Sequence, residues 1–193
     1  KKICYYKYYL EEMAPVAPEV YEQAAAARLA PSEVLSVFEV NRLFEPEKLP
    51  GQRGYCARPD GSAYLANKMS MPGVTPEMFD WWFAWHGLDS LRYKIWDRED
   101  HMYCQTRNPE QARDPKLSYK EKYWNTRHDV IEAFGPEPKE VVIPFIPPQD
   151  MGFDPEKLKD FKGTIVAMAP EDNRTVACHF VQPVEGGIEL YSR

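Results

Sequence analysis

The sequence lacks any run that approaches the roughly 18 apolar residues of a membrane-spanning helix, and its first residues lack the apolar core of a signal peptide. It also has little positive charge: 24 Lys and Arg stand against 30 Asp and Glu, which gives a net charge of −6. Binding to a phosphate backbone depends on clustered Lys and Arg. We therefore predict a cytoplasmic protein that binds neither a membrane nor nucleic acid.

Cysteine is scarce, and the four cysteines stand far apart without CxxC spacing. This spacing indicates neither a zinc knuckle nor a disulfide framework, so we predict four reduced thiols. The sequence also lacks GxSxG, P-loop, HExxH, EF-hand and GxGxxG motifs. Short motifs alone therefore assign no chemistry to the chain.

Aromatic residues are abundant, with 9 Phe, 5 Trp and 12 Tyr, and hydrophobic residues make up 44% of the chain. This composition predicts a folded core and favours a ligand cavity lined by rings. The 18 prolines are about twice the usual ~5% and predict many stiffened loops. A length of 193 residues suits one domain, or one domain with an appendage.

Residues 1–53 are predicted to form a helical region, with helices over residues 18–29 and 31–44. A segment that contains Pro and Gly follows the second helix and ends the region. Residues 54–66 contain two short runs around Asp60-Gly61 and predict a β-hairpin. We therefore place a domain boundary between residues 1–53 and residues 54–193. Both ends of the sequence look cut, so the chain is expected to be a fragment.

Thr75-Pro76-Glu77 predicts the start of a helix that Gly87 ends, because Thr caps, Pro fits the first turn and Glu complements the dipole. Its body is apolar on nearly all sides, so we expect it to be buried. Residues 91–96 alternate between apolar and polar and predict a strand. Residues 105–122 are polar and predict a long surface excursion.

Further strands are expected over residues 129–134, 141–145 and 163–168, and a last hairpin joins residues 175–181 to 188–191. Strands in meander order, with a buried helix near the start, predict an α+β fold. We expect its scaffold to be a curved antiparallel sheet.

Four histidines and one glutamate are candidates for chemistry. His86 ends the tryptophan-rich helix, where a core or capping histidine is the simpler interpretation. His128 and Glu132 are four residues apart, but their segment is β-branched, so this spacing is coincidental in a strand. His101 closes an acidic stretch and fits either a solvated turn or a site. Glu132 and His179 each interrupt an apolar strand. A carboxylate in such a strand needs a wet cavity, a partner or a cation, and a histidine there would face the concave side of the sheet.

A long segment carries a family resemblance: residues 71–86, MPGVTPEMFDWWFAWH, then Arg92-Tyr93-Lys94-Ile95-Trp96 and Asp100-His101. Further matching residues are Gly54-Tyr55-Cys56, Val130-Ile131-Glu132 and Pro147-Pro148. Over residues 54–193 the sequence resembles the 2,4-diacetylphloroglucinol hydrolase family, which includes phloretin hydrolase. The resemblance implies a Bet v 1-like helix-grip catalytic domain, preceded by a region that forms a homodimer. It also implies hydrolysis of a carbon–carbon bond between an acyl group and a polyhydroxylated ring of a small acylphenol.

The resemblance further implies a zinc ion held by two histidines and two glutamates, of which His101 and Glu132 match the first pair. The second pair is a His-x-x-x-Glu on a long C-terminal helix, and the sequence has no such pair after Glu132. We therefore expect a chain cut before that helix, which binds zinc weakly.

Other matching positions imply contacts with the substrate. Tyr93 matches a tyrosine that binds the ring oxygens, and His179 matches a histidine that helps proton transfer. Cys104 stands where the family has asparagine, while Trp85 and His86 belong to the predicted wall around the ring. Two alternatives remain open: a non-catalytic helix-grip module that binds an aromatic polyketide without metal, and a non-haem iron oxygenase with two histidines and one carboxylate.

Overall fold

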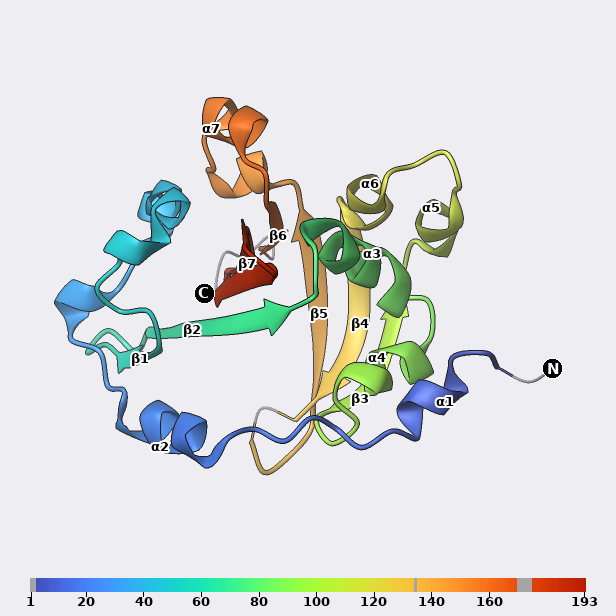
Figure 1. Ribbon diagram of the computed structural model, residues 1–193, viewed down its shortest axis with the longest axis horizontal. Helices are drawn as coiled ribbons and strands as arrows, with labels where there is room; N and C mark the ends of the chain where they lie inside the picture. Colours follow the sequence, from blue (N-terminus) through green and yellow to red (C-terminus); the bar gives the residue numbers. More distant parts are fainter. Residues whose placement is uncertain (1–2, 134, 170–174) are drawn as a thin grey trace. The chain divides into compact units, whose positions relative to one another are not determined.

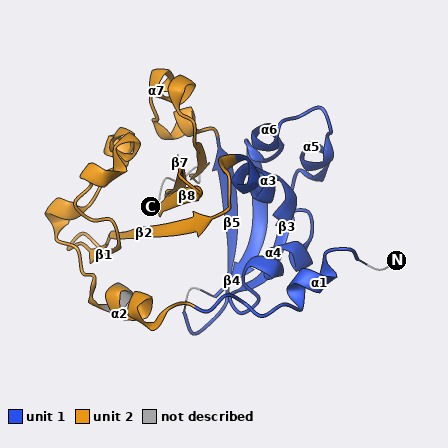
Figure 2. Cartoon of the chain, in the orientation of Figure 1, with its two compact units in different colours: residues 1–15, 77–146 blue, residues 16–76, 147–193 orange. Residues whose placement is uncertain are grey.

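The computed structural model describes residues 3–133, 135–169 and 175–193 (Figure 1). The fold is α+β, and every strand pair whose register is described is antiparallel. The chain divides into two compact units, residues 1–15 with 77–146 and residues 16–76 with 147–193 (Figure 2). Within the described part of the chain, no helix combines the length and the apolar character needed to cross a bilayer.

The first unit, residues 1–15 and 77–146, contains three neighbouring strands in the order β5-β4-β3. Their bounds are β3 His101–Thr106, β4 Thr126–Glu132 and β5 Lys139–Ile146. Its helices are α1 Tyr6–Tyr9, α3 Pro76–His86, α4 Ser90–Trp96, α5 Pro109–Arg113 and α6 Tyr119–Tyr123. Helices α3 and α4 pack on one face of these strands, as Figure 1 shows.

The second unit contains five strands in the order β1-β2-β8-β7-β6. Their bounds are β1 Gly54–Ala57, β2 Ala63–Pro72, β6 Thr164–Met168, β7 Ala177–Val184 and β8 Gly187–Ser192. Its α-helices are α2 Pro18–Ala26 and α7 Pro155–Asp160, and its 3-10 helices are η1 Pro31–Glu33, η2 Val37–Phe44, η3 Pro46–Lys48 and η4 Pro148–Met151.

Aromatic side chains fill the core of this second unit. Phe180 on β7 and Phe153 are buried together with Leu43 of η2. The ring of Phe44 meets the rings of Phe153, Phe161 and Phe180 edge-on, at centroid separations of 5.3–5.9 Å. Edge-to-face packing at this separation is a favourable arrangement of aromatic quadrupoles. The 3-10 segments are thereby held against the strands.

Several local predictions are confirmed. The hairpin β1–β2 turns at Asp60-Gly61, where Gly61 has a positive φ of 83°, and α3 begins at Pro76. The strands expected after residue 129 and the last hairpin are present as β4 to β8. Phe134, the expected end of one strand, lies outside the described residues.

Two local predictions are wrong. Residues 91–96 form helix α4 instead of a strand, because the Asp89 side chain caps the helix by accepting a hydrogen bond from the Leu91 amide at 2.8 Å. Helix α3 is not buried all round, since Met78 is 53% and Trp81 40% exposed while the opposite side packs on the strands. The segment predicted as a surface excursion carries helix α5 and the start of α6.

Candidate active site

The register of β3 against β4 gathers the polar side chains of the first unit. His101 lies opposite Glu132, and Thr106 lies opposite His128. Residues directly opposite each other in an antiparallel pair carry their side chains on the same face. Alternate residues of β4 are buried, including His128 and Glu132. These polar side chains therefore lie on the face of the strands that α3 and α4 cover.

His101 is held by Tyr93 of α4. The two rings stack with centroids 3.9 Å apart and an interplanar angle of 7°. His101 Nδ1 also lies 3.4 Å from the Tyr93 carbonyl oxygen, and since a carbonyl only accepts, Nδ1 is the nitrogen that carries the hydrogen. This tautomer leaves Nε2 with a free lone pair, the arrangement typical of a metal-ligating histidine.

Glu132 is a buried carboxylate, 8% exposed. Within residues 3–133, 135–169 and 175–193, no hydrogen bond or ion pair reaches its carboxylate. Burial accordingly raises the pKa of Glu132 above its usual value. A buried carboxylate without a donor is costly, and a bound cation is one way to remove that cost. His101 and Glu132, opposite each other on β3 and β4, therefore remain candidates for two neighbouring metal ligands.

A second group, His86, Cys104 and His128, lies on the same face, and we call it the His/Cys cluster. One possible ligand atom from each residue lies within 4.8 Å of the other two, and all three residues are buried. Cys104 Sγ is 3.9 Å from His128 Nδ1, and His86 Nδ1 donates to the Trp82 carbonyl oxygen at 2.9 Å. The described part of the chain thus contains a set of groups that could hold a metal ion.

Burial keeps the His/Cys cluster uncharged. It lowers the pKa of His86 to about 4 and that of His128 well below its usual value. Burial also raises the pKa of the Cys104 thiol to about 12, with a smaller contribution from Asp129. At neutral pH the metal-free cluster is therefore two neutral imidazoles and one thiol.

Aromatic rings surround these groups. Tyr93, 7% exposed, stacks on the His86 ring at 5.4 Å as well as on His101. Trp82 stacks on His86 at 5.6 Å. Trp85 packs edge-on against Tyr5 at 5.2 Å, within the same unit. The predicted substrate contacts Tyr93, Trp85, His86 and Cys104 therefore belong to one unit, although their roles stay predictions.

His179, predicted to help proton transfer, lies on β7 in the second unit. Its Nδ1 is 2.8 Å from the Ser192 hydroxyl, and burial lowers its pKa to about 4. Its ring is neutral at pH 7 and its catalytic role stays a prediction.

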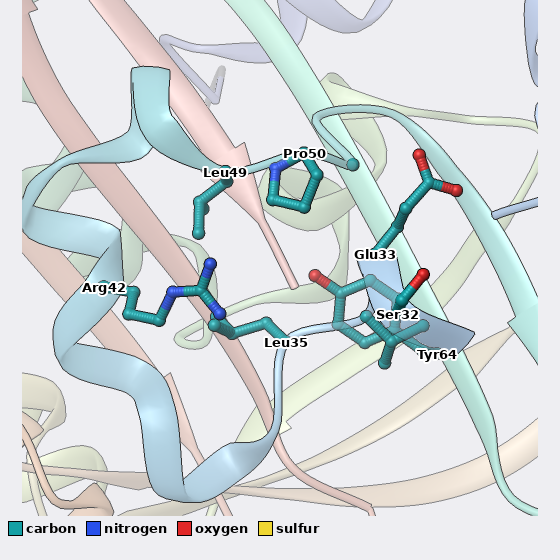
Figure 3. Close-up of a pocket in the computed structure, with 9 residues that line it drawn as sticks. Ser32, Glu33, Leu35, Arg42, Leu49, Pro50 and Tyr64 are labelled. Carbon is teal, nitrogen blue, oxygen red and sulfur yellow. The ribbon is translucent and has the colours of Figure 1, made fainter. Parts of the chain in front are cut away.

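The hollows in the described part of the second unit include a small one and a larger one. The smaller, of about 10 Å³, lies among Leu35, Arg42, Leu49 and Tyr64 (Figure 3), and has room for about one water molecule. The other, of about 80 Å³, has mainly apolar walls. Neither is lined by a residue that the sequence singled out for chemistry.

Sequence reasoning missed the His/Cys cluster as a set. It treated His86 as a core or capping histidine and the spacing of His128 to Glu132 as coincidental. Cys104 was considered only because the family has asparagine at that position. The three residues come from α3, β3 and β4 and share no short spacing. No sequence signal would have joined them, because the strand register brings Cys104 and His128 together.

Comparison with known proteins finds relatives whose sequences match along the chain. The sequence profile of the DAPG hydrolase PhiG domain matches residues 35–193. Phloretin hydrolase of Eubacterium ramulus is 34% identical over 197 aligned residues, which cover 100% of this chain and 72% of that protein. The 2,4-diacetylphloroglucinol hydrolases of a Pseudomonas species and of Pseudomonas protegens are each 28% identical, with 67% and 64% of their lengths covered. The chain therefore belongs to the DAPG hydrolase family of enzymes.

Proposed function

We propose that this chain hydrolyses the carbon–carbon bond between an acyl group and a polyhydroxylated aromatic ring, with acylphloroglucinols such as phloretin or 2,4-diacetylphloroglucinol as substrates. The observation that carries the proposal is the position of His101 directly opposite the buried Glu132 in the β3–β4 pair. The family membership supplies the substrate class, because its named relatives act on these compounds. We further propose a Bet v 1-like helix-grip catalytic domain, a homodimer and a cytoplasmic location, as the sequence resemblance implies.

His101 and Glu132 would hold a zinc ion through Nε2 and a carboxylate oxygen, together with a second pair of ligands implied by the resemblance. When bound, zinc lowers the pKa of a coordinated water to about 7 and polarises a carbonyl group. Two features of this chain support the fit. The Nδ1 hydrogen bond to the Tyr93 carbonyl orients the His101 ring, and Glu132 meets no competing donor among the described residues.

Tyr93 would bind the ring oxygens of the substrate through its hydroxyl group. Loss of the acyl group leaves an electron pair on the ring carbon, and the ortho and para oxygens delocalise this charge. Donors that hold these oxygens stabilise the charge as it develops. The stack of Tyr93 between the rings of His86 and His101 fixes its orientation before substrate binds.

A general acid must then protonate the ring carbon. The resemblance implies His179 for this step, and because burial keeps its ring neutral at pH 7, the ring would have to gain a proton before it donates one. Trp85, His86 and Cys104 would shape the wall that receives the aromatic ring.

The test measures metal and turnover together. The chain, extended through the C-terminal His-x-x-x-Glu helix that the resemblance implies, is incubated with phloretin or 2,4-diacetylphloroglucinol, with zinc or with a chelator, and release of the carboxylic acid is followed by chromatography. Zinc-dependent acid release that is lost in His101→Ala and Glu132→Gln supports the proposal. Glu140→Gln, an exposed carboxylate on β5, serves as the matched control and should keep full activity.

Tight ligand binding without acid release and without metal would instead favour a non-catalytic binding module. Consumption of oxygen during turnover would favour an oxygenase. Activity that survives in His101→Ala and Glu132→Gln would place the reaction elsewhere in the protein.

A further inference from the structure

We propose that the His/Cys cluster is a binding site for a soft, monovalent metal ion, Cu(I), separate from the zinc ligands His101 and Glu132. The cluster combines two imidazoles with one thiol from three different elements of one unit. Soft thiolate ligands select Cu(I) and zinc, while imidazole suits copper and zinc alike. The inference does not depend on the proposed hydrolase activity, although His86 and Cys104 also belong to the proposed substrate wall.

The three ligand atoms of the His/Cys cluster need to move only slightly closer together to bind an ion. One ligand atom of each residue already lies within 4.8 Å of the others. Metal bonds of about 2.0 Å to nitrogen and 2.3 Å to sulfur place such atoms roughly 3.5–3.9 Å apart around a trigonal ion. Side-chain rotations that move each atom inward by less than about 1 Å would therefore close the site.

His86 is prepared for this role by its hydrogen bond. Its Nδ1 carries the hydrogen, because it donates to the Trp82 carbonyl oxygen at 2.9 Å, so Nε2 bears the lone pair. A histidine whose other nitrogen donates to a carbonyl is the usual form of a metal ligand. Gly87, the next residue, lies so close that an added Cβ would be 2.3 Å from His128 Cε1. The end of α3 therefore brings His86 directly onto the strand that carries His128.

Charge and coordination number favour Cu(I) over zinc. Cys104 is fully buried, and His86 and His128 are each 3% exposed, so a net charge here would be costly. On binding, the Cys104 thiol loses its proton to solvent, and the resulting thiolate neutralises a single positive charge. Zinc would leave one positive charge buried and would lack the fourth ligand of its usual tetrahedron within the described cluster. With Cu(I), the single thiolate balances the charge of the ion, and three ligands complete its coordination.

The site differs from the proposed zinc site in its ligands. The Tyr93 ring contacts both His86 and His101 and separates the two groups of ligands. Glu132 offers a hard oxygen, which suits zinc better than Cu(I). Variants at Cys104 and at Glu132 should therefore act on different metals.

The test is an anaerobic titration of the chain with Cu(I) against a chromophoric Cu(I) chelator. Cys4 is replaced by serine in every sample, because this exposed thiol would bind Cu(I) by itself. We expect one Cu(I) per chain that resists the chelator. Since changes outside the ligand shell already weaken metal sites by about 10–100-fold, Cys104→Ala should weaken binding by roughly 100-fold or more.

Two controls separate this site from other effects. Cys178→Ala removes another buried thiol, in the second unit, and should leave the Cu(I) affinity unchanged. Glu132→Gln should also leave it unchanged, even where zinc binding is lost. X-ray absorption on the chain without a change at Cys104 should find one sulfur and two nitrogen neighbours, which keeps the test valid if Cys104→Ala misfolds. Unaltered Cu(I) affinity in a folded Cys104→Ala variant, or a copper shell without sulfur, would overturn the proposal.

Discussion

Replacing Glu132 by glutamine should stabilise the metal-free chain at neutral pH while it removes a proposed zinc ligand. The carboxylate is buried and receives no hydrogen bond from residues 3–133, 135–169 or 175–193. Glutamine has nearly the same shape without the charge. The exchange therefore removes the cost of burying an ion, which is the reverse of the destabilisation that most core substitutions cause.

The size of the effect is the extra cost of burying the charged carboxylate instead of a neutral group of the same shape, and each unit by which burial raises the pKa of Glu132 corresponds to about 1.4 kcal/mol. For a chain of this length each kcal/mol changes the melting temperature by about 2–4 °C, so Glu132→Gln should raise it by about 3–6 °C for each such unit. With zinc bound by the full ligand set that the resemblance implies, the order reverses. The unaltered chain gains stability from binding, and the variant gains little.

The effect must depend on pH, because burial raises the pKa of Glu132 above its usual 4.5. A carboxyl group with a raised folded-state pKa favours folding while it is protonated, below pH 4.5, and this advantage is lost as the pH rises through the folded-state pKa. Glutamine does not titrate. The advantage of the variant should therefore be full at pH 7 and vanish toward pH 4.

The assay is thermal unfolding with a chelator at pH 7 and at pH 4, followed by tryptophan fluorescence, with Glu140→Gln as the exposed control. The reasoning is refuted if the metal-free Glu132→Gln variant melts lower than the unaltered chain at both pH values. That result would mean that the carboxylate has a stabilising partner in the folded chain.

The remaining predictions concern the surroundings of the site. Tyr93→Phe should slow acyl cleavage by roughly 10- to 1000-fold with normal zinc content and melting temperature, measured by steady-state kinetics; an equal loss of stability would make Tyr93 a core residue only. Gly87→Ala should cost about 1–3 kcal/mol in urea unfolding, because its Cβ would lie 2.3 Å from His128 Cε1; a neutral result would show that the His128 ring moves freely. Asp89→Ala should cost about 1–2 kcal/mol by the same method, since it removes the cap on the Leu91 amide, and Asp89→Asn should restore most of this loss.

The sequence by itself determined the features that depend on neighbouring residues. Thr75-Pro76-Glu77 marks the start of α3, and Asp60-Gly61 marks the turn of the first hairpin. Both signals act through backbone dihedrals and local hydrogen bonds, which a few residues decide. The same segment, residues 71–86, carried the family resemblance that the comparisons confirm.

Residues 91–96 show where local patterns fail. Their alternation suits a strand, yet they form α4, because Asp89 caps the first turn and the buried Tyr93 packs on β3. A six-residue pattern is too short to separate a period of 2 from a period of 3.6. Tertiary packing decided between the two.

Only the tertiary structure decided which chemical groups meet. The register of β3 on β4 places His101 opposite Glu132, a pair that the sequence joined by resemblance alone. The same register, with the end of α3, assembles His86, Cys104 and His128, which no spacing relates. The structure also shows that the Glu132 carboxylate is buried and receives no hydrogen bond within the described part of the chain. Strand pairing and helix docking join residues far apart in the chain, and their energies depend on contacts that a local pattern does not contain.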